Sequence, residues 1–176
     1  MKNEKRIASK EIYHGHIFNV YQDRVEIAGE EHQRDKVEHP GGVCIAAEIK
    51  PDQFIVVRQY RYGVNEPCIE FPAGKLEPNE NPLHAGLREL EEETGYKANT
   101  LFDCGVIYPS PAYLSERIYL YYSNSLSWIG QHLDEGEYLD VMTTSFQDLL
   151  DGILDNTSRD AKTIALVLKI QAMKKD

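Results

Sequence analysis

The chain has 176 residues, of which 27% are charged and 41% are hydrophobic, and its formal net charge at pH 7 is −10. At about 150 residues per domain, this length predicts one domain with a sizeable core. The excess of acid argues against a nucleic-acid backbone as the main partner. No apolar run approaches the roughly 20 residues of a membrane span, and no apolar segment follows the charged first residues as in a signal peptide.

The three cysteines, Cys44, Cys68 and Cys104, are odd in number and lack the C-x-x-C spacing of a metal or redox site. Reduced thiols are typical of the cytosol, where disulfides are rare. The composition therefore predicts a soluble, acidic, cytoplasmic protein that has neither a nucleic acid nor a membrane as partner. A phosphate-bearing substrate fits only where the negative charge is locally offset, most simply by a divalent metal ion.

The N-terminal part of the chain is predicted to be rich in β-strands. Apolar residues alternate roughly with period two from Glu11 to Glu38, and residues 28–31 (Ala-Gly-Glu-Glu) are typical of a hairpin turn. The sequence His-Pro-Gly-Gly at residues 39–42 is a strong loop signal. We therefore divide the chain into a β-rich region over residues 1–42 and a main domain over residues 43–176.

The main domain is predicted to mix strands and helices. Short apolar runs at residues 43–47 and 54–57 predict a buried hairpin. The further predicted elements are a turn at residues 72–74, a helix over about 81–94, strands near 101–108, 118–122 and 138–143, and helices near 146–153 and 161–173. Because the connections are of hairpin length, the fold class is α/β or α+β with a mixed sheet.

The helix predicted over residues 81–94 places three carboxylates on one face. At about 100° per residue, Glu89 and Glu93 lie about 40° apart, and Glu92 lies about 60° to the other side of Glu89. Like charges at this spacing destabilise a helix unless a cation is present. Such an oxygen-rich cluster suits Mg²⁺ or Mn²⁺, and Arg88 is placed to pair with Glu92. Taken alone, the pattern also fits a solvated acidic face.

The residues around this helix fit a longer pattern. Residues 74–96 match GX5EX7REUXEEXGU at every fixed position, with U apolar or aromatic. This stretch resembles the Nudix box, and the chain is similar to Nudix hydrolases, which cleave nucleoside diphosphates linked to another moiety. The resemblance implies a Nudix α/β/α sandwich with a mixed sheet, here with an N-terminal antiparallel β-region. It also implies Mg²⁺ as cofactor, with Mn²⁺ as a substitute, and metal ligands at Glu89, Glu92, Glu93 and the carbonyl of Ala73.

Segments outside the box narrow the resemblance to the ADP-ribose pyrophosphatase subgroup. Pro111 follows Gly95 by sixteen residues, the offset that marks this subgroup, and residues 133–141 and 160–163 are also similar to it. The resemblance covers nearly the whole chain. One departure is Ala112, where the subgroup usually has glycine, and we expect its methyl group to restrict the loop or narrow the site.

The resemblance also implies roles for residues outside the predicted helix. In the connection over residues 123–136, which is long for a loop, Glu135 is the implied general base and Glu137 an additional metal or water ligand. The implied substrate contacts are Arg34 and Arg61 to the nucleotide or its phosphates, Glu116 to ribose hydroxyls and Phe18 to adenine. Taken as residues alone, the arginines also fit surface ion pairs, Glu116 a strand edge, Phe18 a core position and the glutamate pair a solvated loop.

The choice of general base rests on two glutamates that stand two residues apart. Gly136 lies between Glu135 and Glu137 and permits a bend, so that one carboxylate reaches water while the other reaches metal. We expect Glu135, which comes earlier in the loop, to be the base, and we assign catalytic roles to Glu135 and Glu93. If neither glutamate of the pair serves as base, Glu92 is the candidate.

These residues predict Mg²⁺-dependent hydrolysis of the pyrophosphate of ADP-ribose to AMP and ribose 5-phosphate. One alternative is the same reaction on another nucleoside diphosphate sugar, such as GDP-mannose or ADP-glucose. Another is a non-catalytic Nudix-fold module that senses a nucleotide, although the intact box argues against it. The family's habit of exchanging its N-terminal region predicts a homodimer in which Arg34 serves the neighbouring subunit's site.

Overall fold

The computed structural model describes residues 2–133, 136 and 138–174. Packing divides the chain into two compact units. Unit 1 comprises Met1–Gly41 and Tyr108–Arg117, and unit 2 comprises Gly42–Ile107 and Ile118–Asp176. The boundary drawn from the sequence, after residue 42, lies beside the first of these limits, whereas the return of residues 108–117 to unit 1 was not predicted.

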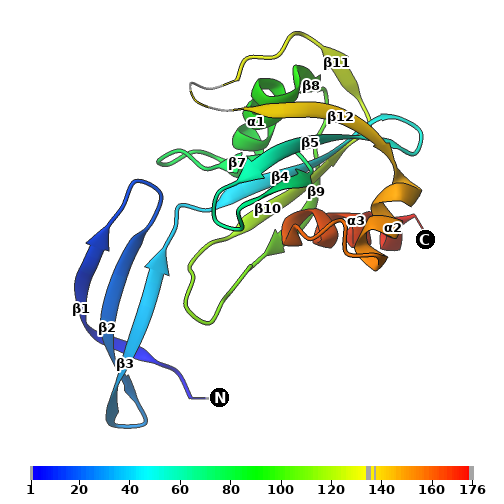
Figure 1. The fold of residues 1–176 in the computed structure, drawn as a ribbon. Coiled ribbons are helices and arrows are strands. Elements are labelled where there is room, and N and C mark those ends of the chain that lie inside the picture. Colours follow the sequence, from blue (N-terminus) through cyan, green and yellow to red (C-terminus); the bar gives the residue numbers. More distant parts are fainter. Residues whose placement is uncertain (1, 134–135, 137, 175–176) are drawn as a thin grey trace. The chain divides into compact units, whose positions relative to one another are not determined.

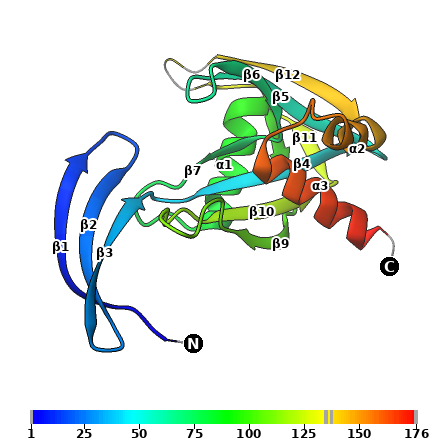
Figure 2. The same ribbon diagram turned by 60° about the horizontal axis from the view of Figure 1, so that its bottom comes forward.

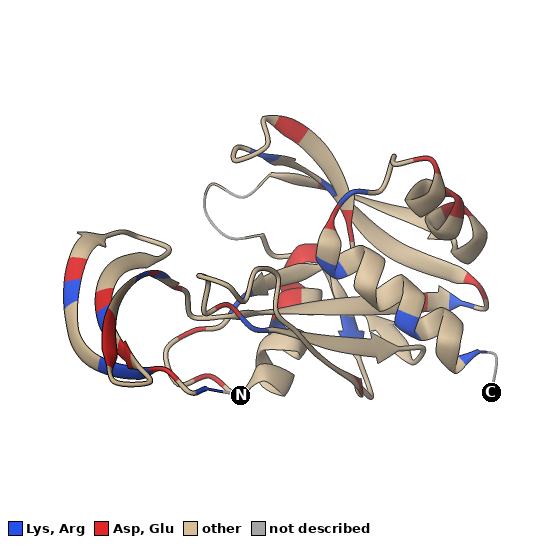
Figure 3. Cartoon of the chain, turned by 90° about the horizontal axis from the view of Figure 1, so that it is seen from below, with Lys and Arg blue, Asp and Glu red and all other residues tan. Residues whose placement is uncertain are grey.

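Unit 1 is built on a three-stranded antiparallel sheet in the order β1-β2-β3 (Figure 1). Its strands are β1 (Lys5–His14), β2 (Asn19–Ile27) and β3 (Glu30–Glu38), and they carry both acidic and basic residues (Figure 3). Ala28 and Gly29 connect β2 to β3 with φ values of 55° and 88°, which is the geometry of a two-residue hairpin turn. The predicted hairpin is therefore confirmed.

Unit 2 contains a seven-stranded sheet in the order β12-β5-β4-β10-β9, with β6 paired to β5 and β7 paired to β4. The pair β10–β4 is parallel and the other pairs are antiparallel, so the predicted mixed sheet is confirmed. Two further short strands pair apart from this sheet. The strands are β4 (Gly42–Lys50), β5 (Gln53–Arg61), β6 (Glu66–Glu70), β7 (Ala73–Lys75), β8 (Tyr96–Ala98), β9 (Phe102–Ile107), β10 (Ile118–Ser123), β11 (Leu126–Trp128) and β12 (Leu139–Ser145).

Helices cover both faces of this sheet (Figures 1 and 2). Helix α1 (Pro82–Thr94) packs on one face, and α2 (Phe146–Leu154) and α3 (Ala161–Met173) pack on the other. Strand β4 lies between them: its residues 43, 45 and 47 join the core under α1, and residues 44 and 46 join the core under α2 and α3. A strand buried on both faces is apolar throughout, which explains the continuous run from Val43 to Ala47.

Helix α1 begins and ends where the sequence predicts. The side chain of Asn81 accepts a hydrogen bond from Leu83 N at 2.9 Å, and Gly95, with φ of 74°, ends the helix by donating its N–H to Glu91 O. The buried face consists of Ala85, Gly86, Leu90, Glu93 and Thr94. A carboxylate is thus turned toward the sheet.

Two local predictions were wrong. Residues 72–74 were expected as a turn, but Ala73–Lys75 form β7, whose residue Lys75 pairs with Gly42 of β4. The connection expected over residues 123–136 contains β11, which pairs with β8. Strands of three residues are too short to display an alternating pattern, and their pairing partners lie far away in the sequence.

In the described part of the chain, no helix is both long enough and apolar enough to span a bilayer.

Candidate active site

The last turn of α1 buries a carboxylate against β7. Glu93 is 1% exposed, and Ala73 N donates a hydrogen bond of 3.0 Å to its Oε2. A buried carboxylate needs hydrogen bonds or a cation to replace its lost hydration. The short pairing of β7 with β4 brings the Ala73 backbone to this position, so the β7 segment is part of the site.

Gly74 lies directly under a second carboxylate of α1. A Cβ atom on Gly74 would lie 1.8 Å from the carboxyl carbon of Glu89 and 2.0 and 2.1 Å from its two oxygens. No side chain fits there unless Glu89 moves. The glycine that opens the matched box therefore leaves the room that the Glu89 carboxylate occupies.

Arg88 supplies positive charge to the acidic residues around α1. Its Nε and Nη2 atoms donate to the two carboxylate oxygens of Glu80 at 2.9 and 3.0 Å. Its Nη1 atom lies 2.8 Å from Glu92 Oε2 and 3.0 Å from Glu89 Oε1. The hydrogen bonds with Glu80 raise the pKa of Arg88 and lower the pKa of Glu80. The pairing with Glu92 was predicted, whereas Glu80 had been matched to the box without a role.

The glutamates of α1 offer the oxygen donors that hard cations prefer. Among the described residues, no three His, Cys, Asp or Glu side chains converge as a ready-made metal site. One reason is that Glu89 and Glu92 both contact Arg88, while Glu93 contacts Ala73. The carboxylate chemistry of these glutamates fits a divalent cation. The assignment of Ala73 and these glutamates as ligands remains a prediction.

A second charged cluster surrounds Glu70 at the end of β6. Glu70 is 1% exposed and accepts hydrogen bonds of 2.8 and 2.7 Å from Nε and Nη2 of Arg61. Lys162 also donates to Glu70, and to Asp160 at 2.8 Å. Burial alone would raise the pKa of Glu70, but the hydrogen bonds from Arg61 and the charge of Lys162 outweigh it and hold that pKa below its ordinary value. Arg61, predicted to contact substrate, is thus held by a buried carboxylate.

The other predicted substrate residues lie in unit 1. Arg34 donates to Glu4 through Nε at 2.9 Å and Nη2 at 3.0 Å on an exposed surface. Glu116 lies 3.5 Å from Nδ1 of His39. Phe18 is 41% exposed and lines a cavity of about 300 Å³ together with His39. Their predicted roles are compatible with these positions and remain predictions.

Glu135 and Glu137 lie outside the described residues. The roles predicted for them, as general base and as additional metal or water ligand, therefore stay predictions as well. The described residues on either side, Leu133 and Tyr138, line a cavity of unit 2.

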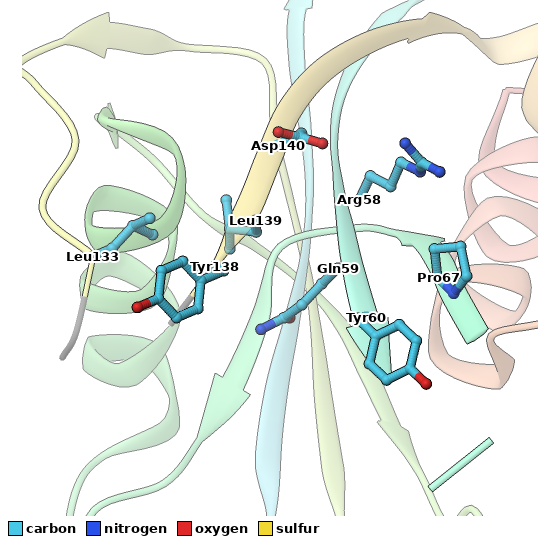
Figure 4. A pocket seen from close by; sticks show the side chains of 8 residues that line it. All are labelled: Arg58, Gln59, Tyr60, Pro67, Leu133, Tyr138, Leu139 and Asp140. Carbon is cyan, nitrogen blue, oxygen red and sulfur yellow. The ribbon is translucent and has the colours of Figure 1, made fainter. Parts of the chain in front are cut away.

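That cavity has a volume of about 340 Å³ and contains a residue that the sequence analysis missed (Figure 4). Gln59 of β5 lines it beside Leu139 of β12. Its Oε1 atom is buried, and no donor within the described part of the chain reaches it. A buried acceptor without a donor is costly. In the sequence, Gln59 is one polar residue of a strand that continues past the apolar run ending at Val57, and nothing there marks it as a site residue.

Comparison with known proteins agrees with this geometry. The NUDIX domain profile matches residues 25–167. The chain is 36% identical over 171 residues to the ADP-ribose pyrophosphatase of Bacillus subtilis (strain 168), a match that covers 96% of this chain and 92% of that protein. It is 34% identical, with the same coverage of both chains, to the methanol dehydrogenase activator of Bacillus methanolicus.

A solved structure has the same fold. It is described as the crystal structure of ADP compounds hydrolase, with a TM-score of 0.85 and coverage of 98% of this chain and 95% of that one. Its sequence identity of 22% supports the fold alone. The chain belongs to the NUDIX family. It is a Nudix hydrolase, an enzyme of a family that generally uses divalent metal ions.

We predict that Gly74→Ala damages the site more than the fold. The added methyl group displaces the end of the flexible Glu89 side chain, so we expect a stability loss of about 1 kcal/mol or less and at least a tenfold loss of activity, roughly 1.4 kcal/mol in the barrier. Gly63→Ala is the control, because a Cβ there meets nothing within 4 Å. Thermal unfolding and turnover of both variants test this. An active Gly74→Ala enzyme contradicts the proposed placement of Glu89.

We predict that Glu70 contributes stability that acid removes. Because the pKa of Glu70 in the folded protein is lower than its ordinary value of 4.5, this stability is complete above pH 4.5 and is lost as the pH falls through the folded pKa. Urea unfolding between pH 7 and pH 3 measures it. We expect the difference in free energy of unfolding between wild type and Glu70→Gln to become smaller as the pH falls. Glu66→Gln, on the same strand, is the control, and a constant difference for Glu70→Gln would be evidence against the prediction.

Proposed function

We propose that this enzyme hydrolyses the pyrophosphate of ADP-ribose to AMP and ribose 5-phosphate, with Mg²⁺ as cofactor. The observation that carries pyrophosphate hydrolysis is the arrangement of α1, in which Glu89 and Glu93 lie against β7 and Arg88 contacts the surrounding acids. The choice of ADP-ribose is supported by the similarity to the Bacillus subtilis ADP-ribose pyrophosphatase over almost the whole of both chains.

In the proposed mechanism, different residues hold the metal ligands and activate the water. When bound, Mg²⁺ supplies charge neutralisation to the diphosphate and lowers the pKa of the attacking water. Ala73 N fixes the carboxylate of Glu93, and Arg88 orients Glu89 and Glu92. In this proposal Glu135 takes a proton from water. The water oxygen then bonds to one phosphorus as the bond from that phosphorus to the bridging oxygen breaks. The bridging oxygen and its electron pair leave with the other phosphate, so that two monophosphates result.

The proposed substrate contacts are those implied by the family resemblance. Arg61 binds phosphate, which suits a guanidinium already oriented by Glu70 and 38% exposed. Phe18 stacks on adenine, which suits an exposed aromatic ring on the wall of a cavity. Arg34 contacts the nucleotide or its phosphates, and Glu116 accepts hydrogen bonds from ribose hydroxyls.

We propose that the protein is a homodimer in which the N-terminal region packs on the partner. Large apolar residues of β1 are exposed, including Ile7 at 43%, Ile12 at 54% and Tyr13 at 54%. Exposed apolar surface on a small sheet favours an interface. Light scattering at micromolar concentration tests the dimer, and a fully active monomer would refute it.

A phosphate-release panel tests the substrate. ADP-ribose, ADP-glucose, GDP-mannose, diadenosine polyphosphates and NADH are each incubated with Mg²⁺ and a coupled phosphatase that acts on the monophosphate products. ADP-ribose is expected to give the highest kcat/KM. A kcat/KM for GDP-mannose tenfold above that for ADP-ribose, equal to about 1.4 kcal/mol, would contradict the assignment of ADP-ribose and favour GDP-mannose as the substrate.

A second candidate function rests on the Bacillus methanolicus relative, which is named for activating methanol dehydrogenase. By that likeness, the protein activates a dehydrogenase, either through its hydrolytic activity or as a nucleotide sensor. The same panel shows whether any of the nucleotides is turned over, and a separate binding measurement with ADP-ribose shows whether a nucleotide is bound. Nucleotide binding without turnover of any substrate would favour the sensor.

We predict that Glu93→Gln loses most of its turnover while keeping its fold. Glutamine retains an oxygen for the Ala73 N–H, and the loss of one negative charge reduces repulsion along α1. The melting temperature without metal is therefore expected to hold or rise slightly, and the stabilisation by added Mg²⁺ is expected to shrink. Glu91→Gln on the same helix is the control. Near wild-type turnover of Glu93→Gln at saturating Mg²⁺ would remove Glu93 from the metal site.

We predict different defects for the two loop glutamates. Glu135→Gln should lower kcat by about 10²–10⁴, the usual contribution of a general base, with little change in the Mg²⁺ requirement. Glu137→Gln should instead raise the Mg²⁺ concentration needed for half-maximal rate. Rates measured against Mg²⁺ for both variants decide the assignment. Rescue of Glu135→Gln by metal reverses the roles, and a loss below tenfold in both makes Glu92 the candidate base.

A further inference from the structure

Residues 128–132, here called the α1 strap, run across the C-terminal end of α1. Ile129 N and Gly130 N donate to Gly95 O at 2.9 and 3.2 Å. His132 N donates to Glu92 O at 3.2 Å, and the side-chain Nε2 of Gln131 donates to Glu93 O at 2.6 Å. The strap therefore satisfies backbone carbonyls that the end of a helix leaves without partners.

The carbonyls that the strap binds belong to the acidic turn. Glu92 and Glu93 are the last two glutamates of α1, and their side chains are proposed metal ligands. Their backbone is thus held from outside the helix, because the local cap, Gly95 N, donates one residue earlier, to Glu91 O. Helix ends fray when they are not capped, and fraying here would move both carboxylates.

The strap is itself anchored beside the helix end. Trp128 of β11 pairs with Tyr96 of β8, and their rings meet edge to face at 5.1 Å and 67°. Gly95 has φ of +74°, and a Cβ on it would lie 2.5 Å from Trp128 Cζ3 and 2.8 Å from Gln131 N. The indole and the strap backbone therefore lie directly against the turn that ends α1.

We propose that Gln131 is a positioning residue for the metal site. By holding the carbonyl of Glu93, its side-chain amide fixes the last turn of α1 so that the Glu93 carboxylate stays beside Ala73 N. In this proposal Gln131 acts through the backbone carbonyl of Glu93. This inference rests on the proposed function, because it assumes that Glu93 binds the cation.

The test is Gln131→Met, which keeps a side chain of similar length but removes the donor. Mn²⁺ binding is measured by electron paramagnetic resonance on the full chain without substrate. Loss of one hydrogen bond is expected to raise the Kd for Mn²⁺ by roughly threefold to tenfold, with the same rise in the Mg²⁺ needed for half-maximal rate. Gln131→Ala repeats the measurement with a shorter side chain.

Gln147→Met is the matched control. Gln147 is an exposed glutamine of α2 whose Nε2 donates to Asp151 Oδ1 at 2.8 Å, so the variant removes a glutamine side-chain hydrogen bond away from α1. Its Kd for Mn²⁺ should equal that of the wild type. In a Glu93→Gln background, Gln131→Met should change the Kd less than twofold, because its effect passes through Glu93.

The outcomes separate this inference from the proposed function. If Glu93→Gln leaves the Kd for Mn²⁺ unchanged, the metal assignment itself fails. If Glu93→Gln weakens binding but Gln131→Met does not, the positioning role of Gln131 is wrong. A lower melting temperature of Gln131→Met with an unchanged Kd would make Gln131 a simple helix cap and would also overturn the inference.

Discussion

The structure depends on the concentration of negative charge along one helix. Helix α1 carries Glu89, Glu92 and Glu93 within two turns, and it buries Glu93 against the sheet. Such a helix is unfavourable by itself, since its carboxylates repel one another and one has lost water. The surrounding residues offset this cost. Arg88 contacts two of the glutamates, and Ala73 N donates to the third.

The mixed sheet explains why these groups meet. Strand β4 is apolar on both faces and fixes α1 on one side of the sheet and α3 on the other. Strand β7 pairs with β4 through only three residues, yet that pairing places the Ala73 N–H beside Glu93 and the Gly74 backbone under Glu89. The site is therefore assembled from a short strand and a long helix that share one neighbour, and a side chain at Gly74 would displace the Glu89 carboxylate.

Local patterns predicted much of this, and non-local contacts explain the rest. Helical periodicity and Gly95 as a stop were enough to place α1, because both are local signals. The role of Gln131 was not visible in the sequence, since its donor acts on a carbonyl 38 residues away. The strand β11 was missed for the same reason. The unpartnered oxygen of Gln59 depends on neighbouring strands and carried no sequence signal.

The two arginines predicted as substrate contacts differ in how deeply their ion-pair partners are buried. From the sequence, Arg34 and Arg61 had the same standing, because both fit phosphate binding and surface ion pairs. In the structure Arg34 pairs with Glu4 where both side chains are over 40% exposed, so solvent competes and little order is gained. Arg61 pairs with Glu70, whose side chain is 2% exposed. A guanidinium held in this way has already lost much of its rotational freedom, so binding a phosphate costs it less entropy. Burial of Glu70 therefore makes Arg61 the better ordered of the two guanidinium groups, which favours Arg61 for the proposed phosphate contact.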